Sequence, residues 1–220
     1  MENEAKVSIV AWWLLALISL FLWYRNLEYD RALAVYIFVL ALIQLIEYAV
    51  YSGAKGPQAA KAMYVALWLQ CLVLAIGVFV FTLVSKGQSN LENYQVYSSF
   101  LAGWGVFFFG VVFLGVLGTV FFGDDSFNAQ VIDGQIVWTR NGQTFLADWG
   151  WLYLIGFFLP LVVLLFFYAW NNVGLYLLLL YGVLVCSYVL LVYPPAEHSQ
   201  LYAYLSVGFA FLVWMLGMFY

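Results

Sequence analysis

The sequence predicts an all-α membrane protein: a seven-transmembrane helix bundle with a small extramembrane β-meander between the fourth and fifth helices. Composition is the first reason, because the 220 residues are 67% hydrophobic and 8% charged, with a mean hydropathy of +0.98. About a quarter of the residues in a soluble domain are charged. Seven long apolar stretches and one polar loop with two hairpin signals are the other reasons. This composition excludes a soluble enzyme, a disordered chain and a nucleic-acid-binding protein.

The apolar stretches have the length of transmembrane helices. A helix needs about 20 apolar residues to cross a hydrocarbon core of roughly 30 Å. Residues 1–220 are predicted to form one domain, and an odd number of spans places the two termini on opposite faces of the membrane. Tryptophans and tyrosines gather at the span ends, as in an aromatic belt. The predicted spans cover residues 7–24, 31–51, 62–84, 96–122, 149–170, 173–193 and 200–220.

Basic residues beside the spans do not decide the orientation, because their numbers on the two faces are nearly equal. The longest loop is acidic and lies on the face of the N-terminus, so we favour that face as the outer one. The basic residues are Lys6, Lys55, Lys61 and Arg140 on the N-terminal face, and Arg25, Arg31 and Lys86 on the opposite face.

Residues 123–148 form the one long loop and predict a three-stranded meander on the N-terminal face. Asp133-Gly134 and Asn141-Gly142 each lie between short apolar runs. Both pairs are typical of type I′ hairpin turns, which need two positive φ angles. In this register Trp138 faces Phe145, and Thr139 faces Thr144. The loop would serve as a lid over the helix ends, or as a gate or docking surface for protein partners.

The polar side chains of the spans concentrate near the N-terminal face. Glu47 is the one carboxylate clearly inside a span, and Gln44 and Tyr48 share its helical face. Asp30 continues this face at the opposite end of the helix. The direction of each span sets the depth of its residues. Further polar groups are thereby predicted in the same layer: Gln70, Ser187, Tyr202, Tyr204 and Ser206.

This polar layer has three interpretations. Hydrogen bonds between Gln and Ser side chains hold membrane helices together without any ligand. A carboxylate inside the membrane is costly and is therefore a candidate functional group. The layer would then form a pocket for a small molecule or an ion, open to the N-terminal face. The third interpretation is a path through the bundle in which Glu47 takes or gives a proton.

The sequence lacks the residues that several kinds of catalytic and cofactor sites require. His198 is the only histidine, so a multi-histidine zinc site is not predicted. The last span contains no lysine for a retinal Schiff base, and we find no phosphate-binding loop or nucleophile elbow. Cys71 and Cys186 both fall inside spans, where they read as small core residues. We therefore identify no cofactor or metal, and an enzyme is the least supported class.

A set of short motifs resembles an uncharacterised multipass family that occurs in large DNA viruses of algae and protists and in some eukaryotic hosts. The resemblance implies a seven-helix bundle with this hairpin loop. It carries no activity, ligand or catalytic residue. The chain departs from the family where Gln-Pro is expected, because Gln70 is followed by Cys71. The matching motifs are Arg25-Asn26, Asp30-Arg31, Ile43-Gln44, Glu47-Tyr48, Gln70 and residues 136–138.

Two functional hypotheses follow. The first is a membrane protein that binds or conducts a small molecule or ion through the pocket around Glu47. The alternative is a structural or assembly subunit of a membrane complex or a virion membrane, because complete catalytic sets are lacking and aromatic residues are abundant. Pigment binding is a variant of the first hypothesis. The lipid bilayer is the expected partner in both, and the sequence carries no signal for the oligomeric state.

Overall fold

The computed structural model describes residues 2–26, 30–84 and 92–145. This part contains four helices, α1 (Glu2–Arg25), α2 (Asp30–Tyr51), α3 (Gly56–Val84) and α4 (Glu92–Phe122), followed by a small sheet. Each helix is long and apolar enough to cross a membrane. The first four predicted spans are therefore confirmed as helices. The spans predicted at 149–170, 173–193 and 200–220 lie outside the described residues.

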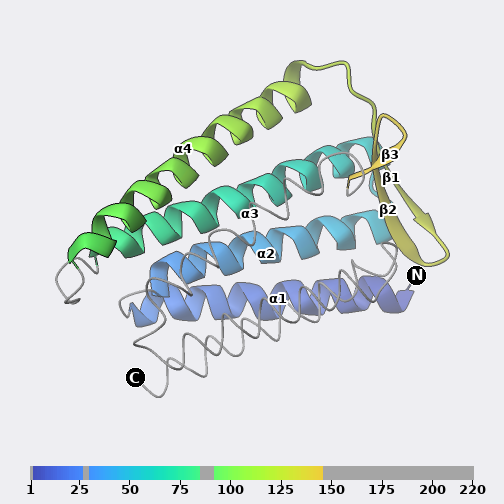
Figure 1. Ribbon diagram of the computed structural model, residues 1–220. Coiled ribbons are helices and arrows are strands. Elements are labelled where there is room, and N and C mark those ends of the chain that lie inside the picture. The colour runs from blue at the N-terminus through green and yellow to red at the C-terminus, as the bar shows by residue number, and fades with distance from the viewer. Residues whose placement is uncertain (1, 27–29, 85–91, 146–220) are drawn as a thin grey trace.

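The four helices lie side by side in chain order, and each packs against the helix before it. Their connections are short, so neighbouring helices run in opposite directions. The sheet follows α4 and lies at the end of the bundle where α1 begins (Figure 1). The chain's N-terminus and the sheet are thus at the same end, as the sequence predicts.

Local signals explain where the helices end. Asn26 has a positive φ of 54° and closes α1, and its N–H donates to the carbonyl oxygen of Leu22. Gly53, with a φ of 94°, ends α2. The N–H groups of Gly53 and Ala54 donate to the carbonyls of Val50 and Ala49, which is a Schellman motif. These caps end α1 and α2 within a few residues of the start of the next helix, and α1 packs against α2 and α2 against α3.

The three-stranded meander is confirmed, with strand order β1 (Phe127–Ile132), β2 (Gln135–Arg140) and β3 (Gln143–Thr144). Thr139 pairs with Thr144, and the rings of Trp138 and Phe145 stack with centroids 6.4 Å apart. Both turns also have the predicted backbone. The φ angles are 50° and 82° at Asp133 and Gly134, and 51° and 79° at Asn141 and Gly142.

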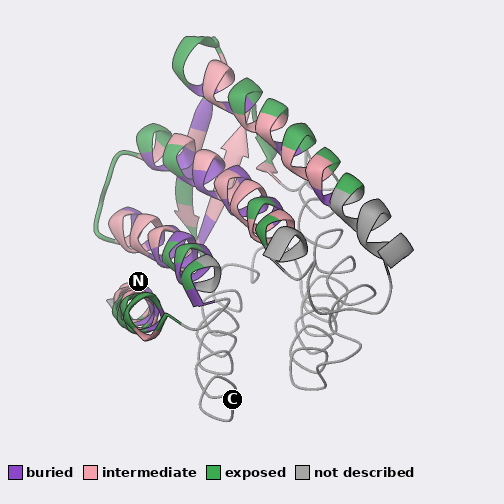
Figure 2. Ribbon diagram, turned by 90° about the vertical axis from the view of Figure 1, so that its left-hand side faces the viewer, coloured by how far each residue is buried: buried purple, intermediate pink, exposed green. Residues whose placement is uncertain are grey.

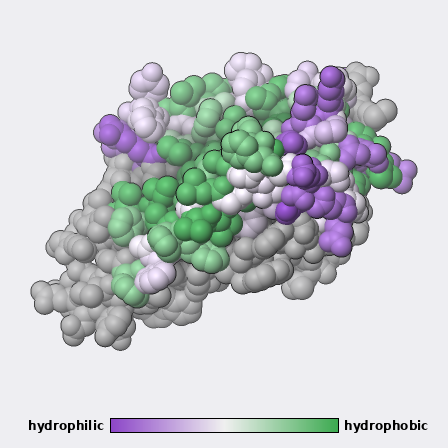
Figure 3. All heavy atoms as spheres, turned by 90° about the horizontal axis from the view of Figure 1, so that it is seen from above, coloured by the Kyte–Doolittle hydropathy of each residue, from purple (hydrophilic) through white to green (hydrophobic). Residues whose placement is uncertain are grey.

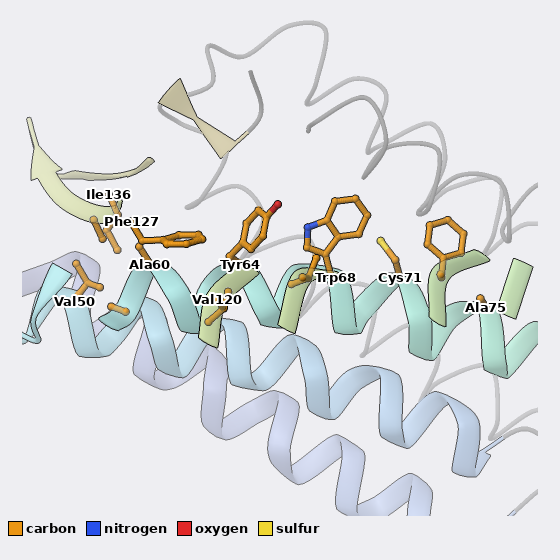
Figure 4. Close-up of a cluster of buried hydrophobic side chains, with 13 residues drawn as sticks. Val50, Ala60, Tyr64, Trp68, Cys71, Ala75, Val120, Phe127 and Ile136 are labelled. Atoms are coloured by element: carbon orange, nitrogen blue, oxygen red, sulfur yellow. The ribbon is translucent and has the colours of Figure 1, made fainter. Parts of the chain in front are cut away.

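The largest apolar core joins α3, α4 and the sheet. Along α3, Tyr64 and Trp68 lie at the centre of this cluster, and Tyr64 packs against Phe127 of β1 at a centroid distance of 5.4 Å (Figure 4). Strand β1 passes so close to the start of α3 that only glycine fits at Gly56. A second cluster, which includes Leu15, Leu22 and Ile37, joins α1 to α2. The sheet is therefore fixed to the helices by side-chain packing.

The outer helices expose apolar side chains as lipid-facing helices do. Only 17% of the apolar window of α4 and 28% of that of α1 is buried, against about half for α2 and α3. In Figure 2 exposed and intermediate residues dominate along α4, while α2 and α3 carry more buried ones. In Figure 3 apolar side chains cover the middle of the visible helices, while hydrophilic ones gather at the sheet end. This pattern is that of an integral membrane protein.

Candidate functional site

The hairpin of α1 and α2 brings Ser8 to Glu47. Its register is marked by the buried hydroxyl of Ser19, which donates to the carbonyl oxygen of Ala34 over 2.8 Å. Counting outward from the tight turn in both directions places Ser8 opposite Glu47. The side chains of Gln44 and Ser8 face the Glu47 carboxylate. Gln44 is 0% exposed, and Glu47 and Ser8 are each 4% exposed. We call these three residues the Glu47 site.

Gln44 is the unusual member of the Glu47 site. Among the described residues, its Oε1 atom has no hydrogen-bond partner and its Nε2 atom has none beyond the nearby Glu47 carboxylate, although the side chain is completely buried. A buried polar group without a partner costs about 1–3 kcal/mol, so such groups are rare and call for an explanation. The side chain of Gln44 thus has both donor and acceptor capacity left over, directly beside a buried carboxylate.

The turn between β1 and β2 lies directly above the Glu47 site. The hydroxyl of Tyr51 donates to the carbonyl oxygen of Gly134 over 3.3 Å. Glu4 of α1 also lies near this turn, because a Cβ atom added to Gly134 would be 3.9 Å from the Oε1 atom of Glu4. Tyr51 is one helical turn beyond Glu47, and Glu4 is one turn before Ser8. Glu47 and Ser8 are therefore each about 6 Å along their helices from a residue whose side chain reaches this turn.

No basic residue neutralises Glu47 within the described part of the chain. The chain has seven Lys and Arg residues, and none follows Arg140. Lys86 follows the end of α3 that is far from the sheet, outside the described residues. Lys6 and Lys55 are exposed. Arg25 pairs with Asp30, and Arg140 pairs with Asp125. Arg31 lies over the Trp23 ring, and Lys61 donates to the carbonyl oxygen of Val120.

Gln70 is not part of the Glu47 site. Its Nε2 atom donates to the hydroxyl of Tyr36 over 2.9 Å, and both side chains are buried. Tyr36 precedes Gln44 by eight residues on α2, which is about 12 Å along the helix. The prediction that Gln70 lies at the depth of Gln44 is therefore wrong. The cause is the start of α3, which begins at Gly56 and not near residue 62, so Gln70 lies deeper along the helix.

The remaining predicted site residues have different outcomes. Tyr48 is half-buried beside Glu47 on α2. Asp30 accepts two hydrogen bonds from Arg25, of 2.7 and 2.6 Å, at the opposite end of the hairpin. This ion pair closes the turn between α1 and α2 and is remote from Glu47. Four residues lie outside the described part of the chain, namely Ser187, Tyr202, Tyr204 and Ser206.

A second polar cluster lies outside the membrane-like band, at the edge of the sheet. Arg140 pairs with Asp125 at 2.9 Å and donates to the hydroxyl of Tyr64 at 3.0 Å. Asn141 donates to the other carboxylate oxygen of Asp125. The hydrogen bond from Asn141, followed by that from Arg140, holds the pKa of Asp125 below its usual range. This cluster fixes the start of β1 to β2 and to α3.

The comparisons with known proteins supply no relative. No family model matches the chain. Neither a curated protein nor a solved structure matches it. Within the described residues no group of three His, Cys, Asp or Glu side chains is arranged to hold a metal ion. The functional argument therefore depends on the chemistry of the Glu47 site.

Proposed function

We propose that this chain is a multipass integral membrane protein that binds a small molecule or an ion at the Glu47 site, with the sheet as its cover. One observation carries the proposal. In the described residues, Gln44 is completely buried with no hydrogen-bond partner for its amide oxygen, and it lies beside a buried carboxylate that has no basic partner. Pairing of Gln44 with the Glu47 carboxylate alone leaves the amide oxygen of Gln44 unused.

The proposal includes the finer architecture that the sequence predicts. Three further spans, at residues 149–170, 173–193 and 200–220, complete a seven-helix bundle with termini on opposite faces and the sheet on the outer side. Tyr202 and Tyr204, with Ser187 and Ser206, then reach the depth of Glu47 from the last two spans. The resemblance to the multipass family of large DNA viruses belongs to this proposal as well.

Access of water to Glu47 tests the proposed function. A water-soluble carbodiimide with an amine nucleophile converts a reachable carboxyl group to an amide, which peptide mass spectrometry locates. We expect labelling of Glu47 in the detergent-solubilised protein, because a pocket admits the reagent and a packed interface does not. Asp124, which is exposed in the sheet connection, is the internal positive control. Modified Asp124 with unmodified Glu47 would contradict the proposal.

The alternative function is a structural subunit of a membrane assembly. It is favoured by the apolar outer face of α4, where Phe107, Leu114 and Phe122 are 63%, 68% and 90% exposed. Under this alternative, the protein should copurify with stoichiometric partners after gentle solubilisation. Substitutions on α4 should then disrupt the assembly, whereas Glu47→Gln should leave it intact.

A further inference from the structure

We propose that the occupant of the Glu47 site is a dehydrated monovalent metal cation of the sodium and potassium class. The oxygen atoms of Glu47, Gln44 and Ser8 would hold it between α1 and α2. This inference rests on the proposed function and names the chemical class of its ligand. It is argued from the charge of the site, its donor atoms and its position.

The charge of the site calls for one positive charge from outside the helices. Glu47 brings a single carboxylate into the apolar part of the bundle, where an unpaired charge is costly. The Lys and Arg residues of the described chain are engaged or exposed elsewhere, and Lys86 follows the far end of α3. Two other groups of the chain can carry positive charge: the α-amino group, whose partner is Glu4, and His198, which lies outside the described residues. A monovalent cation neutralises the carboxylate without adding a surplus charge.

The donor atoms suit a hard cation. A carboxylate oxygen, an amide carbonyl oxygen and a hydroxyl oxygen are the ligands that alkali and alkaline-earth ions accept, whereas zinc and copper prefer sulfur and imidazole. Gln44 supplies the decisive observation, because its Oε1 atom is completely buried and has no partner in the described part of the chain. A cation that bridges Glu47 and Gln44 gives this oxygen a partner.

Two other occupants are distinguished from a monovalent cation. A proton on Glu47 removes the negative charge and lets the carboxyl O–H donate to the amide oxygen of Gln44, but this arrangement gives a stability that does not depend on the cation in solution. A divalent cation would place a surplus positive charge in the apolar region, since Glu47 is the only carboxylate of α2 between Asp30 and Tyr51. A monovalent cation satisfies both the charge and the open oxygen.

Cation-dependent stability of the complete, detergent-solubilised protein tests this inference. Thermal unfolding is compared in sodium, potassium, calcium and N-methyl-glucamine chloride at constant ionic strength. At ten times its dissociation constant, a specifically bound cation shifts the folding equilibrium about elevenfold toward the folded state. We expect this shift in sodium or potassium relative to N-methyl-glucamine, and we expect the same cation to slow carbodiimide labelling of Glu47 about elevenfold.

Variants assign the effect to the site. Glu47→Gln, which keeps the shape of the side chain, should abolish the difference between the cations, while Asp124→Asn should preserve it. Ser8→Ala removes one oxygen and provides a milder second variant if Glu47→Gln does not fold; it should weaken cation binding. His198→Ala should leave the cation effect unchanged.

Several outcomes would overturn the cation assignment. They are equal stability in all four salts, an effect of calcium alone, or a sodium effect that persists in Glu47→Gln. Labelling of Glu47 that no cation slows would refute the cation while leaving the proposed pocket in place. Loss of the pocket itself would be seen separately, as failure of the carbodiimide to reach Glu47 in any salt.

Discussion

Gly56→Ala should destabilise the protein by pushing the sheet away from α3. A Cβ atom at this position would overlap the carbonyl oxygen of Ala129 and lie 2.6 Å from the Oδ1 atom of Asn128. Backbone cannot rotate away as a flexible side chain does, so strand β1 must move by several tenths of an ångström or more. Overpacking of this kind costs about 1–3 kcal/mol. For a chain of 220 residues, this corresponds to a fall of about 2–12 °C in the unfolding temperature.

Gly115→Ala is the matched control for this substitution. It makes the same chemical change inside α4, where no described atom lies within 4 Å of the new Cβ. Alanine is favoured over glycine in a helix by up to about 1 kcal/mol, so the control should be neutral or stabilising. Thermal unfolding followed by tryptophan fluorescence measures both variants. If Gly56→Ala unfolds at the same temperature as Gly115→Ala or above it, the close contact between β1 and α3 is refuted.

Two further predictions concern polar contacts. Because hydrogen bonds from Asn141 and Arg140 lower the pKa of Asp125, the stability that Asp125 contributes is complete above the usual pKa of an aspartate and is lost as the pH falls through the lowered value. The stability difference between the wild type and Asp125→Asn should thus be constant from about pH 8 to pH 5 and shrink only in stronger acid; urea titrations that find it shrinking already between pH 7 and pH 5 contradict this. Tyr36→Phe should cost about 1–3 kcal/mol because Gln70 loses a buried partner, and in unfolding experiments the double variant with Gln70→Leu should cost less than the sum of the single changes. Strict additivity would show that the two side chains do not interact.

The sheet was predictable to the level of its register because its turns depend on local backbone chemistry. Asp133-Gly134 and Asn141-Gly142 impose positive φ angles that few other pairs adopt readily. Once the second turn is placed, the pairing of Thr139 with Thr144 follows by counting. The packing of β1 against the start of α3 had no such signal, since it depends on Gly56 and Ala129, which are far apart in the sequence.

The Glu47 site was predictable only in part, because depth in a bundle depends on where each helix begins. Hydropathy detects the apolar part of α3 but not its first turns, whose small and polar residues from Gly56 onward are nevertheless helical. Gln70 was consequently predicted too close to the sheet. Ser8 was missed since one hydroxyl near the end of a span resembles an interfacial residue. The tight turn that ends at Asp30 contained the missing information, because counting from it aligns Ser8 with Glu47.

The contact between Tyr51 and Gly134 also affects how the protein is made. Gly134 follows Tyr51 by 83 residues, and at about 5–20 residues per second the ribosome needs roughly 4–17 s to synthesise that distance. During this interval α1 and α2 have been synthesised while the strands that contact them do not yet exist. The cation that we propose for the Glu47 site would therefore have access to it in the nascent chain before the strands cover the end of the helical hairpin.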